Sequence, residues 1–255
     1  DFASLQRMIG DTLMQKYVAD VSEDTFNRRR VLDIGAGTGY LTNKLANTFQ
    51  SNQSNELIAL DIAPDMLKTA IKATAQHLLN FICADAEVLP LANNTINAIF
   101  SNLAFQWSTD LATLFSECYR VLDADGVMAF SSFGPKTLLE LNQAWAAADD
   151  HVHVNSFIDA TEIEQQLSAV GFQAIDVVYE ELTFYYPSAK SLMRDLKGMG
   201  AHNINEQRKK GLMGVSAFKR MLLSYEQLRD KKGLPATFQA VYGFARKPAG
   251  PTVRA

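Results

Sequence analysis

The chain has 255 residues, of which 47% are hydrophobic and 20% are charged, and its net charge is −4. A chain of this length can bury a full core as one domain, and the composition is that of an ordinary soluble globular protein. The sequence shows no apolar run near the roughly 20 residues of a membrane helix and no signal segment. Its acidic balance argues against non-specific binding to nucleic acid.

Apolar residues at helical spacing predict a leading helix within residues 3–20. Short β-type runs then alternate with helical patterns, which indicates an α/β fold with a mostly parallel sheet covered by helices on both faces. The predicted strands are residues 31–34, 57–61, 79–83, 98–101, 127–133, 172–179, 182–186 and 237–245. The predicted helices are residues 40–49, 64–76 and 111–122, one beginning near Pro135, and one that opens with a capping box at 159–162 and ends at Gly171.

Residues 188–232, here called the basic cap, are helical in pattern and precede the last strand. They contain eleven Lys or Arg and four Asp or Glu, a net charge of +7 that leaves −11 for the rest of the chain. We expect an insertion over the ligand edge of the sheet within a single domain of residues 1–255, whose core is 21–187 and 233–247 behind a leading helix at 1–20. Such segregation of charge suggests an acidic partner or substrate, although any single basic residue can equally lie on a solvated helix face.

The glycine-rich segment Asp33-Ile34-Gly35-Ala36-Gly37-Thr38-Gly39 follows an apolar strand and opens a helix. Glycines at such a turn let the backbone approach a ligand closely, because side chains would block it. A dinucleotide-binding loop would place its last glycine at position 40, which is Tyr40, so a nicotinamide cofactor is disfavoured. The acid-led Gly-x-Gly-x-Gly resembles motif I of the class I methyltransferases, and this resemblance implies S-adenosylmethionine and a Rossmann-like, seven-stranded fold.

Three further segments are similar to that family in the same order. Asp61 ends the second strand and can accept hydrogen bonds from both ribose hydroxyls, with a helix N-cap as its alternative role. Met66 resembles the apolar contact to adenine, with helix core as the alternative. In the segment 84–91, which reads Ala-Asp-Ala-Glu-Val-Leu-Pro-Leu, Asp85 would accept from the adenine amino group beside the backbone of Ala86.

The fourth segment, residues 101–107, follows the fourth strand, where the methyl group of the cofactor would face the acceptor. Phe105 and Trp107 are candidates for the walls of the reaction chamber, or else belong to the core. By this family resemblance the expected cofactor-binding residues are Gln6, Asp33, Gly35, Ala36, Gly37, Gly39, Asp61, Ile62, Met66, Asp85, Ala86, Asn102 and Leu103.

Some motifs are missing from the sequence. No Asn/Asp-Pro-Pro-Tyr/Phe follows the fourth strand, which argues against methylation of a nucleic-acid amino group. His151 and His153 have no third ligand at zinc spacing, so we expect a solvated loop there and no metal. Cys83 and Cys118 fall in apolar patterns, and we expect buried, reduced thiols in a cytoplasmic protein. No general base stands out, which suits an acceptor that is already anionic, such as a carboxylate, or an activated carbon acid.

Stretches outside the cofactor half resemble one family, the BioC type of malonyl-acyl-carrier-protein O-methyltransferase. They are residues 3–6, 133–141, 192–201, 208–214 and 234–245, of which those after residue 188 are the discriminating ones. Two departures are that Thr38 stands where many members have proline, and that an aromatic-containing segment usual before the leading helix is not in this sequence.

The resemblance implies that S-adenosylmethionine esterifies the free carboxylate of a malonyl thioester, giving a methyl ester that primes pimeloyl synthesis for biotin. An acidic, malonyl-loaded acyl carrier protein would then dock on the basic cap, and malonyl-coenzyme A remains open as an acceptor. Lys197, Arg208 and Lys136 are candidates for positioning the malonyl carboxylate or the pantetheine arm. The alternatives are methylation of another carboxylic acid or of a quinone ring carbon, and a non-catalytic binding module.

Overall fold

The computed structural model describes residues 2–18, 30–49, 55–74, 79–149, 156–198 and 215–249. These residues form two compact units, which are described separately. Unit 1 comprises residues 1–5, 133–159 and 179–240, and unit 2 comprises residues 6–132, 160–178 and 241–255. Among the described residues, no helix is both long and apolar enough to cross a membrane.

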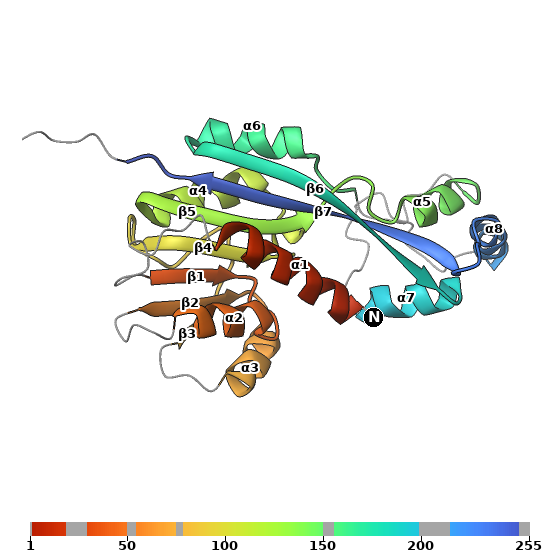
Figure 1. Cartoon of the computed structure of the whole chain (residues 1–255), viewed down its shortest axis with the longest axis horizontal. Helices are drawn as coiled ribbons and strands as arrows, with labels where there is room; N and C mark the ends of the chain where they lie inside the picture. The colour runs from red at the N-terminus through yellow and green to blue at the C-terminus, as the bar shows by residue number, and fades with distance from the viewer. Residues whose placement is uncertain are drawn as a thin grey trace, which may run out of the picture. The chain divides into compact units, whose positions relative to one another are not determined.

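A seven-stranded sheet runs through the chain in the order β3-β2-β1-β4-β5-β7-β6 (Figure 1). Its strands are β1 (Arg30–Ile34), β2 (Glu56–Asp61), β3 (Leu79–Cys83), β4 (Ile96–Asn102), β5 (Leu122–Phe133), β6 (Gln173–Tyr186) and β7 (Leu234–Arg246). Within unit 2, strands β1 to β5 pair in parallel, with β1 between β2 and β4. Consequently the carboxyl ends of β1, β2 and β4 meet at one edge, where parallel sheets of this kind bind ligands.

The helices of unit 2 are α1 (Phe2–Tyr17), α2 (Tyr40–Phe49), α3 (Pro64–Ala73), α4 (Leu111–Val121) and α6 (Ala160–Val170), with a short 3₁₀ helix at Phe105–Trp107. Their starts follow from local chemistry. Pro64 occupies the first turn of α3, where its missing N–H costs nothing. Asp110 caps α4 by accepting a hydrogen bond from the backbone N–H of Thr113. α4 packs against α6, and α3 packs against β2 and β3.

Unit 1 contains the Tyr179–Tyr186 part of β6 and the Leu234–Ala240 part of β7, together with the helices α5 (Leu139–Ala146), α7 (Ala189–Gly198) and α8 (Val215–Glu226). The two strand segments run in opposite directions, because Glu181 lies beside Gln239 and Thr183 beside Thr237. α8 packs against α5 and α7. The buried Tyr225 of α8 donates a hydrogen bond of 2.6 Å to the Pro235 carbonyl oxygen, which ties this helix to β7.

The structure confirms a mostly parallel seven-stranded α/β fold and shows where individual predictions were wrong. The two runs at 172–179 and 182–186 are one strand, β6, because the acidic pair between them lies on the edge strand of the sheet. α5 begins at Leu139 and not near Pro135, since Leu138 before it adopts a left-handed conformation at φ 56°. Helix α3 ends at Ala73, before the predicted residue 76.

The two cysteines differ in their surroundings. Cys118 is buried on α4, as expected. Cys83 is exposed, contrary to the prediction, because it is the last residue of β3, the strand at the other edge of the sheet.

Candidate cofactor and acceptor site

The glycine loop crosses from β1 to α2 at the carboxyl edge of the unit 2 sheet. The backbone N–H groups of Gly35 and Ala36 donate to the Leu60 carbonyl oxygen at 2.8 and 3.0 Å, and this fixes the loop over the end of β2. The N–H of Gly37 donates to Asp61 Oδ2 at 2.7 Å. The loop therefore has a defined shape that is held by its own polypeptide.

Two glycines of this loop have different physical reasons for being glycine. Gly35 has φ +75°, and a Cβ there would lie 2.2 Å from the Cβ of Ala104, so it permits close packing against the segment after β4. Gly37 has φ +55°, and within 4 Å its Cβ would meet, among the described residues, only the Gly35 carbonyl oxygen. The open space in front of Gly37 is where a ligand could approach the backbone.

Asp33 lies beneath the loop and is fully buried. Its Oδ2 accepts a hydrogen bond of 2.6 Å from Thr42 Oγ1, whereas its Oδ1 has no partner among the described residues. Burial, opposed by the Thr42 hydrogen bond and reinforced by the nearby Asp61, raises the pKa of Asp33 to about 7. A buried acceptor without a donor is costly, and it fits a ligand that carries an N–H donor, such as an ammonium group.

Asp61, the expected ribose acceptor, is engaged by backbone groups in this structure. Besides the bond from Gly37, its Oδ1 accepts a hydrogen bond of 2.8 Å from the N–H of Ala63. The alternative role as N-cap of α3 does not apply, because Ala63 occupies that position. Each carboxylate oxygen accepts more than one hydrogen bond, so Asp61 can shape the loop and still receive a hydroxyl.

Apolar side chains stand exposed beside these acids. Ile62 and Met66, which follow β2, are 67% and 46% exposed, and Val88, which follows β3, is 73% exposed. Met66 is therefore not part of the helix core. Exposed apolar side chains at the carboxyl edge of a sheet suit the flat face of a nucleobase.

The segment after β3 presents Asp85 to solvent. Asp85 Oδ1 accepts a hydrogen bond of 2.9 Å from the N–H of Glu87, as in an Asx-turn, with the half-buried Ala86 between them. This bond fixes the direction of the carboxylate and leaves Oδ2 available for a second donor.

At the end of β4, Asn102 connects three segments of unit 2. Its Oδ1 accepts from Ser131 Oγ at 2.7 Å, and its Nδ2 donates to the Gln6 carbonyl oxygen of α1 at 3.0 Å. Leu103 follows in a left-handed conformation at φ 54°, held by a hydrogen bond from its N–H to Ser131 O. Residues with a strained backbone conformation, such as Leu103, are found more often at functional sites than elsewhere. Gln6 itself is exposed on α1.

The two aromatic candidates after β4 have different environments. Phe105 is only 3% exposed, and its ring centroid lies 5.1 Å from that of Phe130 and 6.0 Å from that of Phe115. Its side chain thus belongs to the core. Trp107 is 37% exposed, which leaves it available to an acceptor.

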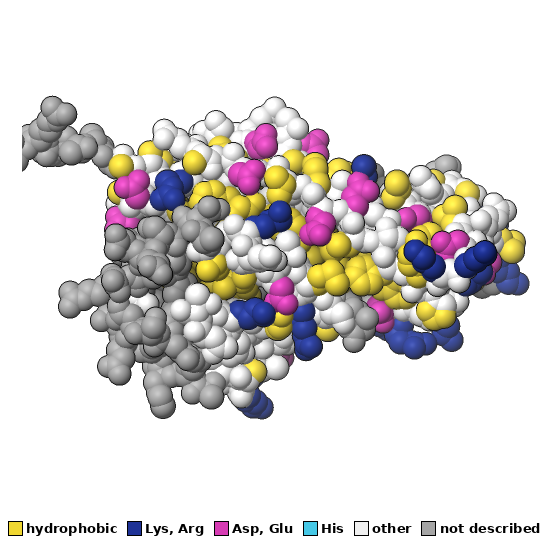
Figure 2. Space-filling model, viewed as in Figure 1, with side chains coloured by type: hydrophobic (Ala, Val, Ile, Leu, Met, Phe, Trp, Pro, Cys, Tyr) yellow, Lys and Arg dark blue, Asp and Glu magenta, His cyan; other side chains and the backbone are white. Residues whose placement is uncertain are grey.

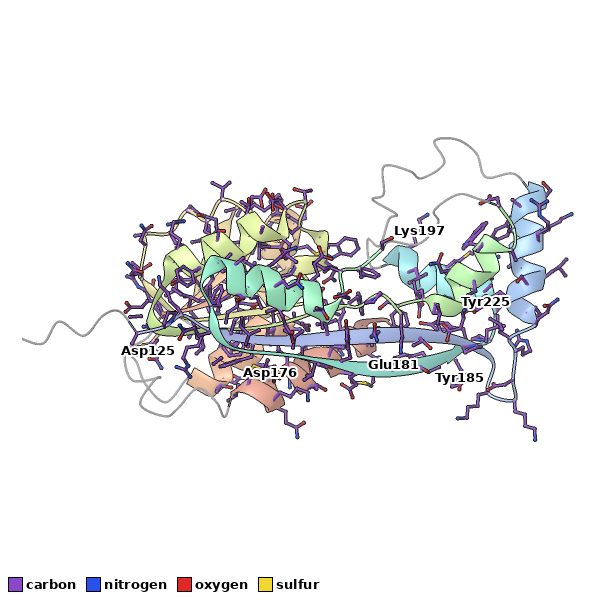
Figure 3. All side chains as sticks on the ribbon, turned by 90° about the horizontal axis from the view of Figure 1, so that it is seen from above. Asp125, Asp176, Glu181, Tyr185, Lys197 and Tyr225 are labelled. Atoms are coloured by element: carbon purple, nitrogen blue, oxygen red, sulfur yellow. The ribbon has the colours of Figure 1, made fainter. Side chains whose placement is uncertain are left out.

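The basic candidates lie in unit 1 or outside the described residues. Lys136 Nζ lies 2.6 Å from Glu181 Oε1, with both side chains about half exposed. Lys197 is exposed near the end of α7, and Figure 3 labels it together with Glu181 on β6. Arg208, His151 and His153 lie outside the described residues. Within the described ranges, no group of three or more His, Cys, Asp or Glu side chains could hold a metal ion.

Comparison with known proteins identifies the family. The chain is 42% identical over 227 residues to the malonyl-[acyl-carrier protein] O-methyltransferase of Gallionella capsiferriformans, covering 86% of this chain and 77% of that protein. It is 38% identical over 269 residues to the protein of the same name from Nitrosospira multiformis, covering 97% and 84%. The chain belongs to the malonyl-[acyl-carrier protein] O-methyltransferase family.

Other comparisons agree with this membership. Residues 32–130 match the family model of a methyltransferase domain. The chain is 38% identical to the biotin biosynthesis bifunctional protein BioHC of Cellvibrio japonicus over 96% of its own length, and it spans about half (47%) of that longer protein. A crystal structure of a proposed methyltransferase from Bacillus halodurans has a TM-score of 0.65 and 18% identity, with 94% of this chain and 99% of that chain covered. The last comparison supports the fold.

Several polar residues of this family member were not singled out from its sequence. Thr42 holds Asp33, and Ser131 holds Asn102. Gln239, buried on β7, accepts a hydrogen bond from the N–H of Lys136 and lies 3.4 Å from Glu181. No local pattern marks these residues, because each partner lies on another element. Glu87 lies within the segment 84–91, whose resemblance to the family implies no role for it.

Proposed function

We propose that the chain transfers a methyl group from S-adenosylmethionine to the free carboxylate of a malonyl thioester, forming a methyl ester that primes pimeloyl synthesis for biotin. The observation that carries this proposal is the acid-led glycine loop, open in front of Gly37, in a chain 42% identical to a relative named for this activity. When bound, S-adenosylmethionine supplies an electrophilic methyl group on a sulfonium.

The residues of unit 2 would bind the donor in three parts. Gly37 and the unpaired oxygen of Asp33 suit the amino-acid end of the cofactor. Asp61 suits the ribose. Asp85, with the exposed Ile62, Met66 and Val88, suits the adenine. Their acceptor oxygens and apolar groups match the chemistry of the ligand in the same order as along the chain.

A malonyl carboxylate is anionic at neutral pH, so this reaction requires orientation of the acceptor and no deprotonation step. Trp107 is our candidate for a wall beside the acceptor, since Phe105 is committed to the core. Lys197, Lys136 and Arg208 remain candidates for binding the carboxylate or the pantetheine arm. Of these, Lys136 would have to exchange its partner Glu181 for the substrate.

We further propose that the basic cap docks an acidic acyl carrier protein. Lys190, Arg194 and Lys197 are all exposed on α7 at spacings of four and three residues, so they form one stripe on the helix. In Figure 2, several Lys and Arg side chains lie around the region that α7 and α8 occupy in Figure 1, with a few Asp and Glu side chains among them. A basic stripe on a chain of net charge −4 favours an acidic partner through electrostatic complementarity.

The methyl transfer is tested with labelled S-adenosylmethionine and malonyl-acyl carrier protein. We expect a base-labile methyl ester on the malonyl group. Parallel reactions with malonyl-coenzyme A and a quinone precursor discriminate the acceptors. Label on the quinone precursor and none on either malonyl thioester would overturn the proposal.

The docking surface is tested by charge reversal on α7. We expect K190E/R194E to raise the KM for malonyl-acyl carrier protein about tenfold and to leave the KM for malonyl-N-acetylcysteamine unchanged, because the small thioester has no protein to dock. The control K68E/K72E reverses the same number of charges on α3 and should change neither constant. An equal rise of the KM for malonyl-acyl carrier protein in both variants would mean that this KM depends on the net charge of the chain and not on a docking surface at α7.

We also propose a cytoplasmic location. It is supported by the unpaired thiols of Cys83 and Cys118, of which the exposed Cys83 would be readily oxidised outside a reducing compartment.

A further inference from the structure

Glu87, in the turn after β3, accepts an unusual number of hydrogen bonds from one distant segment. Its Oε1 receives the Ser108 hydroxyl at 2.7 Å and the N–H groups of Thr109 and Asp110 at 2.7 and 3.0 Å. The hydroxyl of Thr109 lies 3.1 Å from Oε1 and 3.0 Å from Oε2. One carboxylate therefore binds three consecutive residues that are 21 to 23 positions away in sequence.

The segments joined by Glu87 lead to two parts of the proposed site. On its own side, the N–H of Glu87 donates to the Oδ1 of Asp85, the candidate acceptor for adenine. On the other side, Ser108 directly follows Trp107, the candidate wall of the acceptor chamber. Glu87 thus lies two residues after Asp85, and its carboxylate accepts a hydrogen bond from Ser108, the residue next to Trp107.

Neither segment needs Glu87 for its local structure. Helix α4, which begins after Asp110, has its own N-cap, because the Asp110 side chain accepts from the N–H of Thr113. The loop after β3 has its own anchors to α4, since the N–H of Leu89 donates to Glu117 and the Leu89 carbonyl oxygen accepts from Arg120. The contacts of Glu87 instead connect the turn after β3 directly to residues 108–110, next to Trp107.

We propose that Glu87 is a positioning residue that couples occupation of the adenine subsite to the placement of Trp107 at the acceptor subsite. The proposal rests on the cofactor site proposed above. Multiple hydrogen bonds to one carboxylate give a stiff connection, because each donor fixes a different direction around the same oxygen atoms. Cofactor binding at Asp85 would then be transmitted through Glu87 to the segment of Trp107 before the acceptor arrives.

The test uses the fluorescence of Trp107. The chain has two tryptophans, so W145F leaves Trp107 as the only one, and S-adenosylhomocysteine is the ligand. In this parent we expect ligand binding to change the Trp107 emission. With E87A added, we expect calorimetric affinity to fall less than about tenfold, the emission change to be lost, and the methyl-transfer rate to fall about 100-fold, as for a misplaced reacting group.

Two further variants keep the test falsifiable should E87A fold poorly. E87Q retains an oxygen for the Oε1 donors and an amide that can face Thr109 Oγ1, so it should restore the emission change. S108A/T109V removes the hydroxyl donors and keeps the two backbone hydrogen bonds, so it should reduce the change in Trp107 emission without abolishing it. E117Q is the matched control, because it disturbs the other glutamate that joins the same loop to α4 and should lower stability without uncoupling the signal.

Three results would overturn the coupling: an E87A response equal to that of the parent, a parent emission insensitive to bound ligand, or uncoupling by E117Q to the same degree. Failure of the proposed function is distinguishable from these. In that case S-adenosylhomocysteine would not bind the parent in the calorimeter, and the coupling proposal would fall with it.

Discussion

Replacement of Asp33 by asparagine should stabilise the ligand-free protein while weakening the binding of its ligand. The carboxyl group is fully buried, and only one of its two oxygens has a partner among the described residues. Burial raises its pKa from the ordinary 3.8 to about 7. The folded state therefore prefers the protonated form, and stability contributed by this group is complete below pH 3.8 and is lost as the pH rises to about 7.

The magnitude follows from the size of the pKa shift. A shift of roughly 3 units at about 1.4 kcal/mol per unit makes the ionised Asp33 cost on the order of 4 kcal/mol at pH 8. D33N removes this cost but buries an N–H that lacks an acceptor, which costs about 1–3 kcal/mol. We expect a net gain in unfolding free energy of about 1–3 kcal/mol at pH 8 and no gain at pH 5, where most of the penalty is absent.

The assay is urea unfolding of both proteins at pH 5, 6.5 and 8, with D65N, an exposed aspartate on α3, as the control. Calorimetry with S-adenosylhomocysteine measures the other half of the prediction. We expect affinity to fall about tenfold or more, because a hydrogen bond to a charged group is lost. Parallel stability curves for wild type and D33N across this pH range would refute the assignment of the raised pKa to Asp33.

Two paired substitutions test the geometry of the site. G35A should lose several kcal/mol of stability or fail to fold, because its methyl group would overlap Ala104. G37A should cost only about 1–2 kcal/mol of stability and still abolish ligand binding. Denaturant unfolding curves measure the stability of both variants, and calorimetry measures their ligand binding. F105A should cost about 3–5 kcal/mol as a core truncation, whereas W107A should fold normally and raise the KM for the acceptor. Similar stabilities for F105A and W107A would contradict this division of roles.

Sequence patterns predicted the parallel half of the fold well because each element there has a local signature. The strand at 31–34, the glycine loop and the helix at 40–49 all appear at the expected residues. Prediction failed where a neighbouring element decides the outcome. β6 continues through its acidic pair because the side chains of an edge strand can alternate toward solvent. β5 begins five residues before residue 127, since Leu122 pairs with Ile96 across a register shift.

In the candidate site too, some residues could be predicted from local sequence and others could not. The acids and glycines at the carboxyl edge could be named from spacing and resemblance, because the chain order of a parallel sheet brings these turns together. The separation of Phe105 from Trp107 could not, since it depends on the rings of Phe130 and Phe115, which only packing brings into contact with Phe105. The hydrogen bonds between Glu87 and residues 108–110 could not be predicted either, because these partners are three ordinary polar residues before α4.

The acids of unit 2 also show how the cofactor site is organised. Asp61 and Asp85 each accept backbone N–H groups from their own or a neighbouring loop, so their carboxylates already point in fixed directions without a ligand. A ligand that uses their remaining lone pairs need not order these loops, and this lowers the entropic cost of binding. Asp33 differs because one of its oxygens has no protein donor among the described residues. Binding energy that depends on the amino-acid end of the ligand should therefore concentrate at Asp33, while Asp61 and Asp85 contribute mainly to orientation.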